Sequence, residues 1–287
     1  MQTNWVIYVG LAVLALKFTI EKVQKYLIYP SNFPEGSRTE VDTPTMYNIP
    51  YEDVKIDTID GERLHAYVMV RGPKSPKTIV LLGPNAGNMG HYLPLAKIFY
   101  DQMGYNVMTV SYRGYGKSTG SPSEKGLQKD AQALLSYIKT NHDLSTTSIV
   151  LYGRSLGGAV ATYLATLPGA SDIIKGIVLE NTFLSVCKLI PIVIPIARPF
   201  SWMVTERWDS AERIKLLKPD IPSLWLGGGK DELIPPSHFE ELFDLCPSKY
   251  KLQKIYPKGT HNDTPMQPGY WQDMHEFLLR KIAPVNV

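Results

Sequence analysis

The sequence has few cysteines: only Cys187 and Cys246 occur among its 287 residues. The two do not form a C-x-x-C pair, and no spacing of cysteine and histidine of the kind that builds a zinc site is present. We therefore expect neither a disulfide framework nor a structural metal, and this cysteine usage fits a reducing compartment. A chain of this length can bury a core large enough to fold without such cross-links.

The sequence also lacks a run of basic residues, internal repeats and low-complexity tracts. Its 30 Lys and Arg residues nearly balance its 27 Asp and Glu residues, which leaves a formal net charge of +3. This balance argues against a nucleic-acid-binding protein. With 44% hydrophobic and 20% charged residues, the composition is that of a globular protein and excludes disorder, collagen-like repeats and a multi-span membrane protein.

One apolar stretch stands out near the N-terminus, from Trp5 to Ile20, and Lys17 is its only charged residue. As a helix it would measure about 24 Å, which is shorter than a hydrocarbon core of about 30 Å. No basic segment precedes the stretch and no A-x-A-like site follows it. We therefore expect an uncleaved membrane anchor within residues 1–29 rather than a signal peptide. A buried helix that caps the main domain is the alternative.

The basic residues near this stretch lie at its C-terminal end, at Lys17, Lys22 and Lys25. By the positive-inside rule, this asymmetry places the main domain in the cytosol. We expect a single-pass protein that contacts membrane lipid through its N-terminal anchor. An endomembrane such as the endoplasmic reticulum is the expected location.

Strands and helices are predicted to alternate through the main domain, residues 30–287. The pair Asp60-Gly61 joins two short strands and is typical of a β-hairpin. The strands that follow are continuous apolar runs, as expected for strands buried on both faces of a parallel sheet. Alternation of this kind predicts a mostly parallel sheet with helices on both faces. The expected strands are Val54–Ile59, Leu64–Val70, Thr78–Leu82, Val107–Ser111, Ser148–Tyr152, Ile177–Leu179, Leu224–Leu226 and Leu252–Tyr256. The expected helices include Tyr92–Gln102, Leu156–Leu167 and Trp271–Ile282.

The alternation is interrupted once, between residues 182 and 220. This interval contains the apolar run Leu189–Ile196, followed by Trp202, Met203 and Trp208. Prolines at positions 191, 195 and 199 exclude one long regular helix. We interpret the interval as an apolar cap inserted over the end of the sheet.

Residues 152–158 read Tyr-Gly-Arg-Ser-Leu-Gly-Gly and contain the pattern G-x-S-x-G. They lie between a predicted buried strand and a helix rich in alanine and glycine, which is the context of a nucleophile elbow. The glycines at positions 153 and 157 let the backbone turn sharply and bring strand and helix close together. We therefore expect Ser155 to be presented at the end of the sheet as a nucleophile.

A serine nucleophile needs a base, and the base needs an acid that orients it. In this architecture the chain order is Ser, then Asp or Glu, then His. Asp231 lies in the loop after one predicted strand, and His261 lies in the loop after the last strand. We therefore predict a catalytic triad of Ser155, Asp231 and His261.

Other residues compete for these two roles. Glu232 and Asp263 are alternatives to Asp231 as the acid, and Asp263 is two residues from His261, where it would tie down its own loop. The five other histidines are expected to have surface or packing roles, although His91 follows the glycine loop after the third strand and could line the pocket. They are His65, His91, His142, His238 and His275.

The loop Leu82–Asn88 follows the third strand and is placed to donate a backbone N–H to an oxyanion. Leu156, the residue after the nucleophile, would supply one donor. Asn85 or Ala86 would supply the other, with Asn85 preferred, because Pro84 has no N–H.

The loop after the fourth strand carries Arg113, Tyr115 and Lys117. These residues either contact an anionic head group or hold a turn, and we favour the turn.

Five motifs together resemble one family. They are Gly83–Asn88, Tyr112–Ser118, Gly153–Gly158, Glu180–Ser185 and Gly259–Thr264. The sequence resembles the bud-emergence-type, membrane-anchored α/β-hydrolases, which are similar to a subset of the vertebrate ABHD proteins. The resemblance runs from about residue 50 to the C-terminus and also covers the N-terminal anchor. It implies an α/β-hydrolase fold and a serine hydrolase with nucleophile Ser155, acid Asp231 and base His261.

The chain departs from this family at one point. Related proteins usually carry His-Gly before Asn-Ala-Gly-Asn, whereas this chain has Gly83-Pro84. The absent histidine would brace the oxyanion loop. Some related ABHD proteins remove acyl groups from protein thiols, so the resemblance also implies a membrane-linked acyl ester or thioester as substrate.

We therefore expect a membrane-anchored serine hydrolase that forms an acyl-enzyme and needs no metal or organic cofactor. The apolar cap favours a lipophilic acyl chain. Two alternatives remain. One is a hydrolase-like scaffold of low activity that binds lipid or protein partners, which the Gly83-Pro84 departure motivates. The other is a peptidase of the same fold, which differs only in the leaving group.

Overall fold

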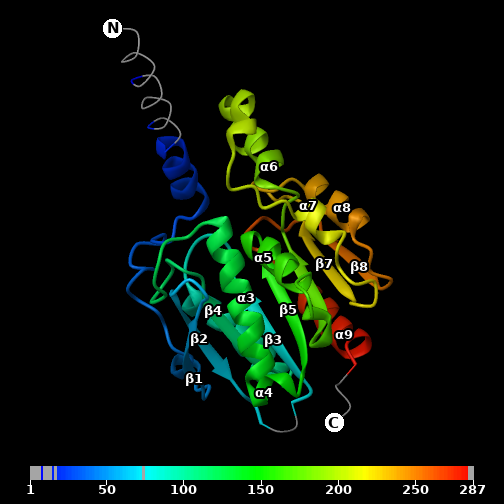
Figure 1. Cartoon of the computed structure of the whole chain (residues 1–287). Helices are drawn as coiled ribbons and strands as arrows, with labels where there is room; N and C mark the ends of the chain where they lie inside the picture. Colours follow the sequence, from blue (N-terminus) through cyan, green and yellow to red (C-terminus); the bar gives the residue numbers. More distant parts are fainter. Residues whose placement is uncertain (1–7, 9–14, 16–17, 73–74, 284–287) are drawn as a thin grey trace.

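The computed structural model describes residues 8, 15, 18–72 and 75–283 (Figure 1). Most of the apolar stretch Trp5–Ile20, and with it most of the expected anchor, lies outside these residues. Residues 18–28 are helical and lead into an irregular connector. Among the described residues, no helix combines the length and the apolar character that crossing a membrane requires.

The core of the fold is a sheet with the strand order β1-β2-β4-β3-β5-β6-β7-β8. β1 pairs antiparallel with β2, and β2 pairs antiparallel with β4. All later neighbours are parallel, from β4–β3 to β7–β8. The strands are β1 (Glu52–Asp57), β2 (Arg63–Met69), β3 (Lys77–Leu82), β4 (Asn106–Ser111), β5 (Ser148–Arg154), β6 (Ile174–Glu180), β7 (Ser223–Gly228) and β8 (Lys251–Tyr256).

The apolar runs in the sequence become the inner strands because both faces of those strands are covered. Every residue of β3, β4 and β7 is buried, whereas β1 at one edge alternates between exposed and buried. The predicted strands are confirmed, although β5 extends to Arg154 and β6 begins at Ile174. All parallel strands end at the same edge of the sheet, so the loops that follow them meet there.

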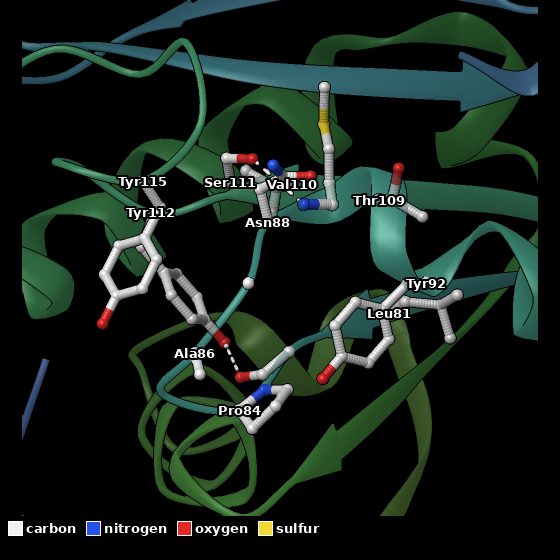
Figure 2. Close-up of a pocket in the computed structure, with 13 residues that line it drawn as sticks. Leu81, Pro84, Ala86, Asn88, Tyr92, Thr109, Val110, Ser111, Tyr112 and Tyr115 are labelled. Carbon is white, nitrogen blue, oxygen red and sulfur yellow. Dashed lines mark hydrogen bonds between the residues drawn. The ribbon is translucent and has the colours of Figure 1, made fainter. Parts of the chain in front are cut away.

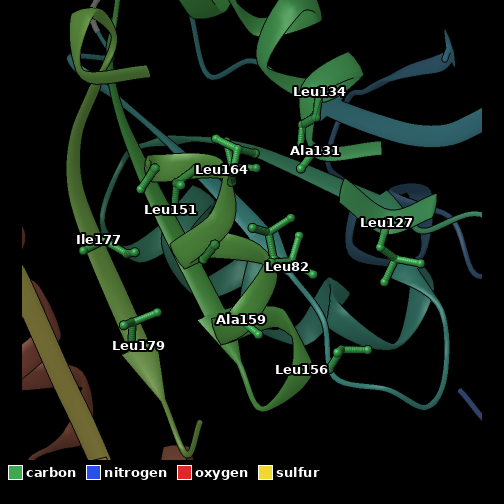
Figure 3. Packing of buried hydrophobic residues seen from close by; sticks show 14 of the residues in the cluster. Leu82, Leu127, Ala131, Leu134, Leu151, Leu156, Ala159, Leu164, Ile177 and Leu179 are labelled. Carbon is green, nitrogen blue, oxygen red and sulfur yellow. The ribbon is translucent and has the colours of Figure 1, made fainter. Parts of the chain in front are cut away.

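Helices cover both faces of the sheet. One hydrophobic cluster contains residues of α3, α5, α7 and α8, and a second cluster on the other face contains residues of α2 and α9. Figure 3 shows α3 and α5 packing leucine and alanine side chains onto β3, β5 and β6. The α-helices are α2 (Leu93–Lys97), α3 (Glu124–Thr140), α4 (His142–Ser145), α5 (Leu156–Ala165), α6 (Val186–Val193), α7 (Ser210–Ile214), α8 (Pro236–Leu245) and α9 (Tyr270–Lys281).

The predicted helix Tyr92–Gln102 is not one regular helix. A 3-10 turn, η2 (Met89–Tyr92), precedes α2, and a π-helical turn, η3 (Ile98–Gln102), follows it. Pro94 lies in the first turn of α2, where its missing N–H removes no helical hydrogen bond. The 3-10 turns η1 (Pro44–Tyr47), η4 (Ala170–Asp172) and η6 (Thr264–Met266) lie in loops.

The predicted cap, residues 182–220, divides into two parts. Its first part consists of α6 and the 3-10 segment η5 (Pro195–Met203), and none of the residues of η5 is buried. α6 ends at Val193, two residues before Pro195, so the interval does not form one long regular helix, as the prolines predict. The second part belongs to the core instead, because Trp208 is 3% exposed and packs with Ala211 and Ile214 of α7. We keep the word cap for residues 186–203.

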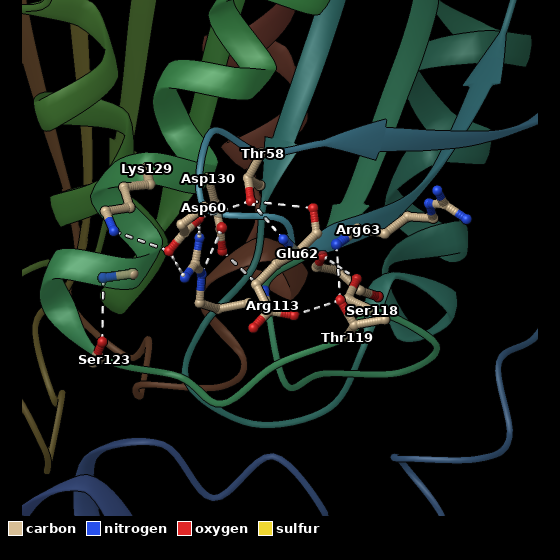
Figure 4. A network of polar contacts seen from close by, with 12 residues as sticks. Thr58, Asp60, Glu62, Arg63, Arg113, Ser118, Thr119, Ser123, Lys129 and Asp130 are labelled. Atoms are coloured by element: carbon tan, nitrogen blue, oxygen red, sulfur yellow. Dashed lines mark hydrogen bonds and ion pairs between the residues drawn. The ribbon is translucent and has the colours of Figure 1, made fainter.

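Arg113 ties three segments of the chain together (Figure 4). Its Nε donates to Oδ1 of Asp130 in α3 at 2.7 Å, and its Nη1 and Nη2 donate to Asp60 in the β1–β2 hairpin at 2.8 and 2.9 Å. The side chain is 5% exposed. These contacts confirm the prediction that Arg113 has a structural role. Its guanidinium is occupied by two carboxylates and is not free to contact an anionic head group.

Replacing Arg113 by methionine is expected to destabilise the protein by about 3–5 kcal/mol, because the buried carboxylate of Asp130 loses its partner. Burial raises the pKa of Asp130 to about 6 even beside Arg113. A carboxyl group whose pKa is raised by folding loses its stabilising contribution as the pH rises. The loss should therefore be smaller at about pH 5 than at about pH 8 in urea unfolding experiments.

The matched control is Arg63→Met. Arg63 forms an exposed pair with Asp57, so its removal should leave the stability nearly unchanged at either pH. Equal destabilisation by Arg113→Met at both pH values would contradict the role assigned to Asp130.

Candidate active site

Ser155 occupies the turn between β5 and α5. Its backbone has φ 53° and ψ −119°, a conformation that non-glycine residues rarely adopt. Two hydrogen bonds hold the turn: Ser155 N–H donates to the carbonyl oxygen of Glu180 at 2.9 Å, and Thr182 Oγ1 donates to the carbonyl oxygen of Ser155 at 2.8 Å. The side chain therefore lies at the carboxyl edge of the sheet, at the N-terminus of α5.

Asp231 and His261 meet at the same edge. Asp231 follows β7, His261 follows β8, and Asp231 Oδ2 lies 2.8 Å from His261 Nδ1. The other carboxylate oxygen of Asp231 accepts hydrogen bonds from the backbone N–H groups of Leu233 and Ile234, at 2.9 and 2.8 Å. Both members of the pair are less than a tenth exposed. The aspartate is thus fixed by its own loop and orients the imidazole.

The two rival acids make other contacts. Glu232 Oε2 accepts from the backbone N–H of His261 at 3.1 Å, and Asp263 Oδ1 accepts from the backbone N–H of Thr260. Both carboxylates hold the loop rather than the imidazole. Of the other histidines, His91 is exposed and its Nδ1 accepts from the backbone N–H of Asn88, which caps η2. His91 therefore serves its own loop and lies outside the cavity that contains Ser155.

Ser155 and His261 line one cavity of about 470 Å³. Its walls come from the helix 18–28 and the connector on one side and from α6 on the other. Apart from His261, its described lining residues include no acidic or basic side chain. The apolar lining comprises Leu27, Ile28, Pro30, Phe33, Pro84, Ala86, Leu156, Phe183, Val186, Leu189, Ile190, Val193, Ile194, Leu233 and Ile234.

The residues predicted to form an oxyanion hole lie in the same cavity. Leu156, Asn85 and Ala86 all line it beside Ser155. Leu156 is the first residue of α5, so no carbonyl one turn earlier is available to its N–H. The side-chain amide of Asn85 donates to the carbonyl oxygen of Ile28 at 3.0 Å. This contact fixes the loop and couples it to the N-terminal helix.

Two tyrosines brace the loop that carries Asn85. Tyr112 Oη donates to the carbonyl oxygen of Gly83 at 2.9 Å (Figure 2). Tyr115 Oη donates to the carbonyl oxygen of Asn85 at 2.8 Å. Sequence reasoning identified the loop of these tyrosines but not this role. The role follows from the sheet order, because both tyrosines follow β4, which is the sheet neighbour of β3. They support the loop in which the chain lacks the usual histidine.

Arg154 holds the histidine loop from the other side. Its Nη2 donates to the carbonyl oxygen of His261 at 2.6 Å, and its Nε lies 3.3 Å from Oε1 of Glu180. Glu180 is fully buried, and the hydroxyls of Tyr152 and Tyr270 donate to its Oε2. Burial raises the pKa of Glu180, and the charge of Arg154 opposes that rise.

Several known proteins are similar to this chain. The family model Hydrolase_4, described as serine aminopeptidase, S33, matches residues 74–212. Protein bem46 of Schizosaccharomyces pombe is 45% identical over 278 residues, which are 94% of this chain and 92% of that protein. An uncharacterized membrane protein of Saccharomyces cerevisiae, YNL320W, is 43% identical over 263 residues, which are 92% of this chain and 91% of that protein.

Among solved structures, the Pyrococcus furiosus esterase Pf2001 is similar in fold. The TM-score is 0.70 at 21% sequence identity, and the match covers 85% of this chain and 95% of that one. Its likeness shows the α/β-hydrolase fold, and the two fungal relatives show the family. The chain belongs to the Bem46-like family of α/β-hydrolases, as the sequence motifs predict.

Proposed function

We propose that this protein is a serine hydrolase that cleaves acyl esters or thioesters. Ser155 Oγ attacks the acyl carbonyl, and His261 takes the hydroxyl proton and later returns it to the leaving group. Asp231 holds the imidazole in the tautomer that this transfer requires. The observation that carries the proposal is that Ser155 and His261 line one apolar cavity while Asp231 contacts His261 Nδ1 at 2.8 Å.

The tetrahedral intermediate needs donors for its oxyanion. We assign them to the backbone N–H groups of Leu156 and Asn85. The hydroxyls of Tyr112 and Tyr115 keep the Asn85 loop in place, which supports an active enzyme over a scaffold of low activity. An acyl-enzyme on Ser155 then forms and is hydrolysed by water, with His261 as the base for the second step.

The walls of the cavity favour a lipophilic acyl group. A free peptide N-terminus would call for an acidic partner, and the described lining residues include no aspartate or glutamate. This favours acyl esters over the aminopeptidase activity that the family description names. The apolar stretch Trp5–Ile20 and the membrane label of the yeast relative support a membrane location. The lysines at positions 17, 22 and 25 favour a cytosolic catalytic domain. A clear preference for short water-soluble esters would contradict the lipophilic substrate.

Labelling by a fluorophosphonate probe tests the nucleophile. Wild-type protein is expected to react, Ser155→Ala to lose labelling completely, and His261→Ala to label at least about 100-fold more slowly, since the serine loses its base. Circular dichroism and thermal unfolding confirm that each variant is folded. Folded wild-type protein that does not label would overturn the proposed function and favour the scaffold.

Arg154→Met tests whether the loop contact matters for catalysis. Because Arg154 contacts His261 through its backbone carbonyl and not through the imidazole, we expect kcat to fall about 10- to 100-fold with KM nearly unchanged. Arg154→Lys should recover part of the loss. The control Arg213→Met removes a cation that contacts Thr166, away from the histidine loop, and should leave kcat unchanged. A rise in KM with kcat unchanged would show that Arg154 does not position His261.

A further inference from the structure

The cap exposes an unusual number of large apolar side chains. Ile192 and Val193 are each 47% exposed, Ile196 is 86%, Phe200 is 60% and Trp202 is 74%. We call these five residues the cap surface. α6 and η5, which carry them, pack against each other and project from the sheet (Figure 1). A soluble protein rarely leaves such a group of side chains uncovered unless they contact a membrane or a partner.

The charges of this segment favour a membrane. Residues 186–203 contain Lys188 and Arg198 and no acidic residue. Both basic side chains are exposed, and Lys188 also pairs with Glu241 of α8 at 2.8 Å. Apolar side chains combined with basic residues are typical of segments that lie in the interface of a bilayer with anionic lipids.

The helix 18–28 adds a second apolar surface beside the cap. Gln24 joins the two, because its Nε2 donates to the carbonyl oxygen of Met203 at 3.0 Å and its Oε1 accepts from the N–H of Thr205 at 2.9 Å. Tyr26 and Leu27 on this helix are 80% and 55% exposed. Phe18 and Val23 of the same helix are exposed as well. A bilayer that contacts these exposed apolar side chains would meet the cap too, which favours lipid over a protein partner.

The cavity of Ser155 lies between these two surfaces. Leu27 and Ile28 line it from the N-terminal helix, and Ile190 and Val193 line it from the cap. Leu27 and Val193 are exposed and also line the cavity, so the apolar surface continues into its wall. An acyl chain could thus pass from lipid to Ser155 without crossing a charged rim.

We propose that the cap surface is a membrane-binding surface, separate from the N-terminal anchor, which inserts Ile196, Phe200 and Trp202 into the boundary between lipid head groups and acyl chains. The acyl substrate then enters the cavity directly from the bilayer. This second step rests on the proposed function, whereas the insertion of the cap does not.

Depth-dependent fluorescence quenching tests the insertion. The full-length protein is reconstituted into vesicles of phosphatidylcholine and phosphatidylserine, with or without bromine on the acyl chains. The chain has five tryptophans, so the emission of Trp202 is obtained as the difference between wild type and Trp202→Phe. We expect the brominated lipids to quench this difference by about half or more. An equal difference signal in both kinds of vesicle would overturn the proposal.

Turnover of two substrates tests the entry route. The triple variant Ile196→Ser, Phe200→Ser and Trp202→Ser leaves the cavity lining intact. We expect it to hydrolyse a long-chain acyl ester embedded in vesicles about tenfold more slowly, with an unchanged rate on a short soluble ester. The control Ile59→Ser removes a side chain that is 88% exposed in the β1–β2 hairpin and should change neither rate. Equal losses on both substrates would contradict entry from the bilayer.

The outcomes separate the two proposals. If wild-type protein hydrolyses neither ester, the proposed function fails, while quenching of Trp202 still reports on insertion. A third outcome is that the wild-type protein self-associates, the triple variant does not, and Trp202 is not quenched. The cap surface would then bind a second copy of this chain, and the membrane proposal would be wrong.

Discussion

Replacing Asp231 by asparagine is expected to lower kcat about 10⁴-fold while leaving the fold intact. The amide oxygen can still accept from the N–H groups of Leu233 and Ile234, so the loop should keep its shape. The amide NH₂, however, would face His261 Nδ1 in place of a carboxylate oxygen 2.8 Å away. Two donors cannot share that contact, so the imidazole must adopt the tautomer that puts a proton on Nε2. It can then no longer accept the proton of Ser155.

Steady-state kinetics on an acyl ester measures this loss, and the rate of fluorophosphonate labelling gives an independent value for the activation of Ser155. The control is Glu232→Gln, an isosteric change at the neighbouring carboxylate. Glu232 contacts only the backbone N–H of His261, so the variant should lose less than about tenfold. If Glu232→Gln lost as much as Asp231→Asn, the assignment of the acid would be wrong.

The sequence predicts much of this fold because the parallel strands are buried on both faces. Such strands must be continuous apolar runs, and Thr78–Leu82 and Val107–Ser111 are examples that the structure confirms. The contact of Asp231 with His261 follows from the same topology. Loops after parallel strands meet at one edge of the sheet, so chain order alone places these residues close together. Their catalytic role stays a prediction until it is measured.

Features that depend on contacts between distant segments could not be predicted in the same way. Trp208 resembles the apolar residues of the cap in sequence, yet it lies in the core, where its Nε1 donates to Tyr29 Oη at 2.8 Å. Tyr112 reaches Gly83 only because β4 and β3 are neighbours. Arg154 occupies a variable position of G-x-S-x-G, and its contact with the carbonyl oxygen of His261 spans more than 100 residues of chain. No local pattern encodes these pairings.

Gly157→Ala is expected to destabilise the protein by about 3 kcal/mol or more and to abolish labelling of the remaining folded fraction. A Cβ atom at position 157 would lie 2.0 Å from the carbonyl oxygen of Leu82 and 2.6 Å from that of Gly83. Both obstacles are backbone atoms, so no side-chain rotation relieves the overlap. Either α5 must move away from β3 or the oxyanion loop must shift, and both changes separate Ser155 from the predicted donor at Asn85. Urea unfolding and the labelling rate measure the two effects.

Gly61→Ala distinguishes this steric cost from the general cost of replacing a glycine. Gly61 lies in the β1–β2 hairpin with φ +84°, and nothing lies within 4 Å of the position of an added Cβ. Only backbone strain of about 1–2 kcal/mol is expected there, with unchanged labelling. If Gly157→Ala were no more costly than Gly61→Ala, the start of α5 would have room to move. The tight approach of α5 to β3 could then not be what fixes the position of Ser155.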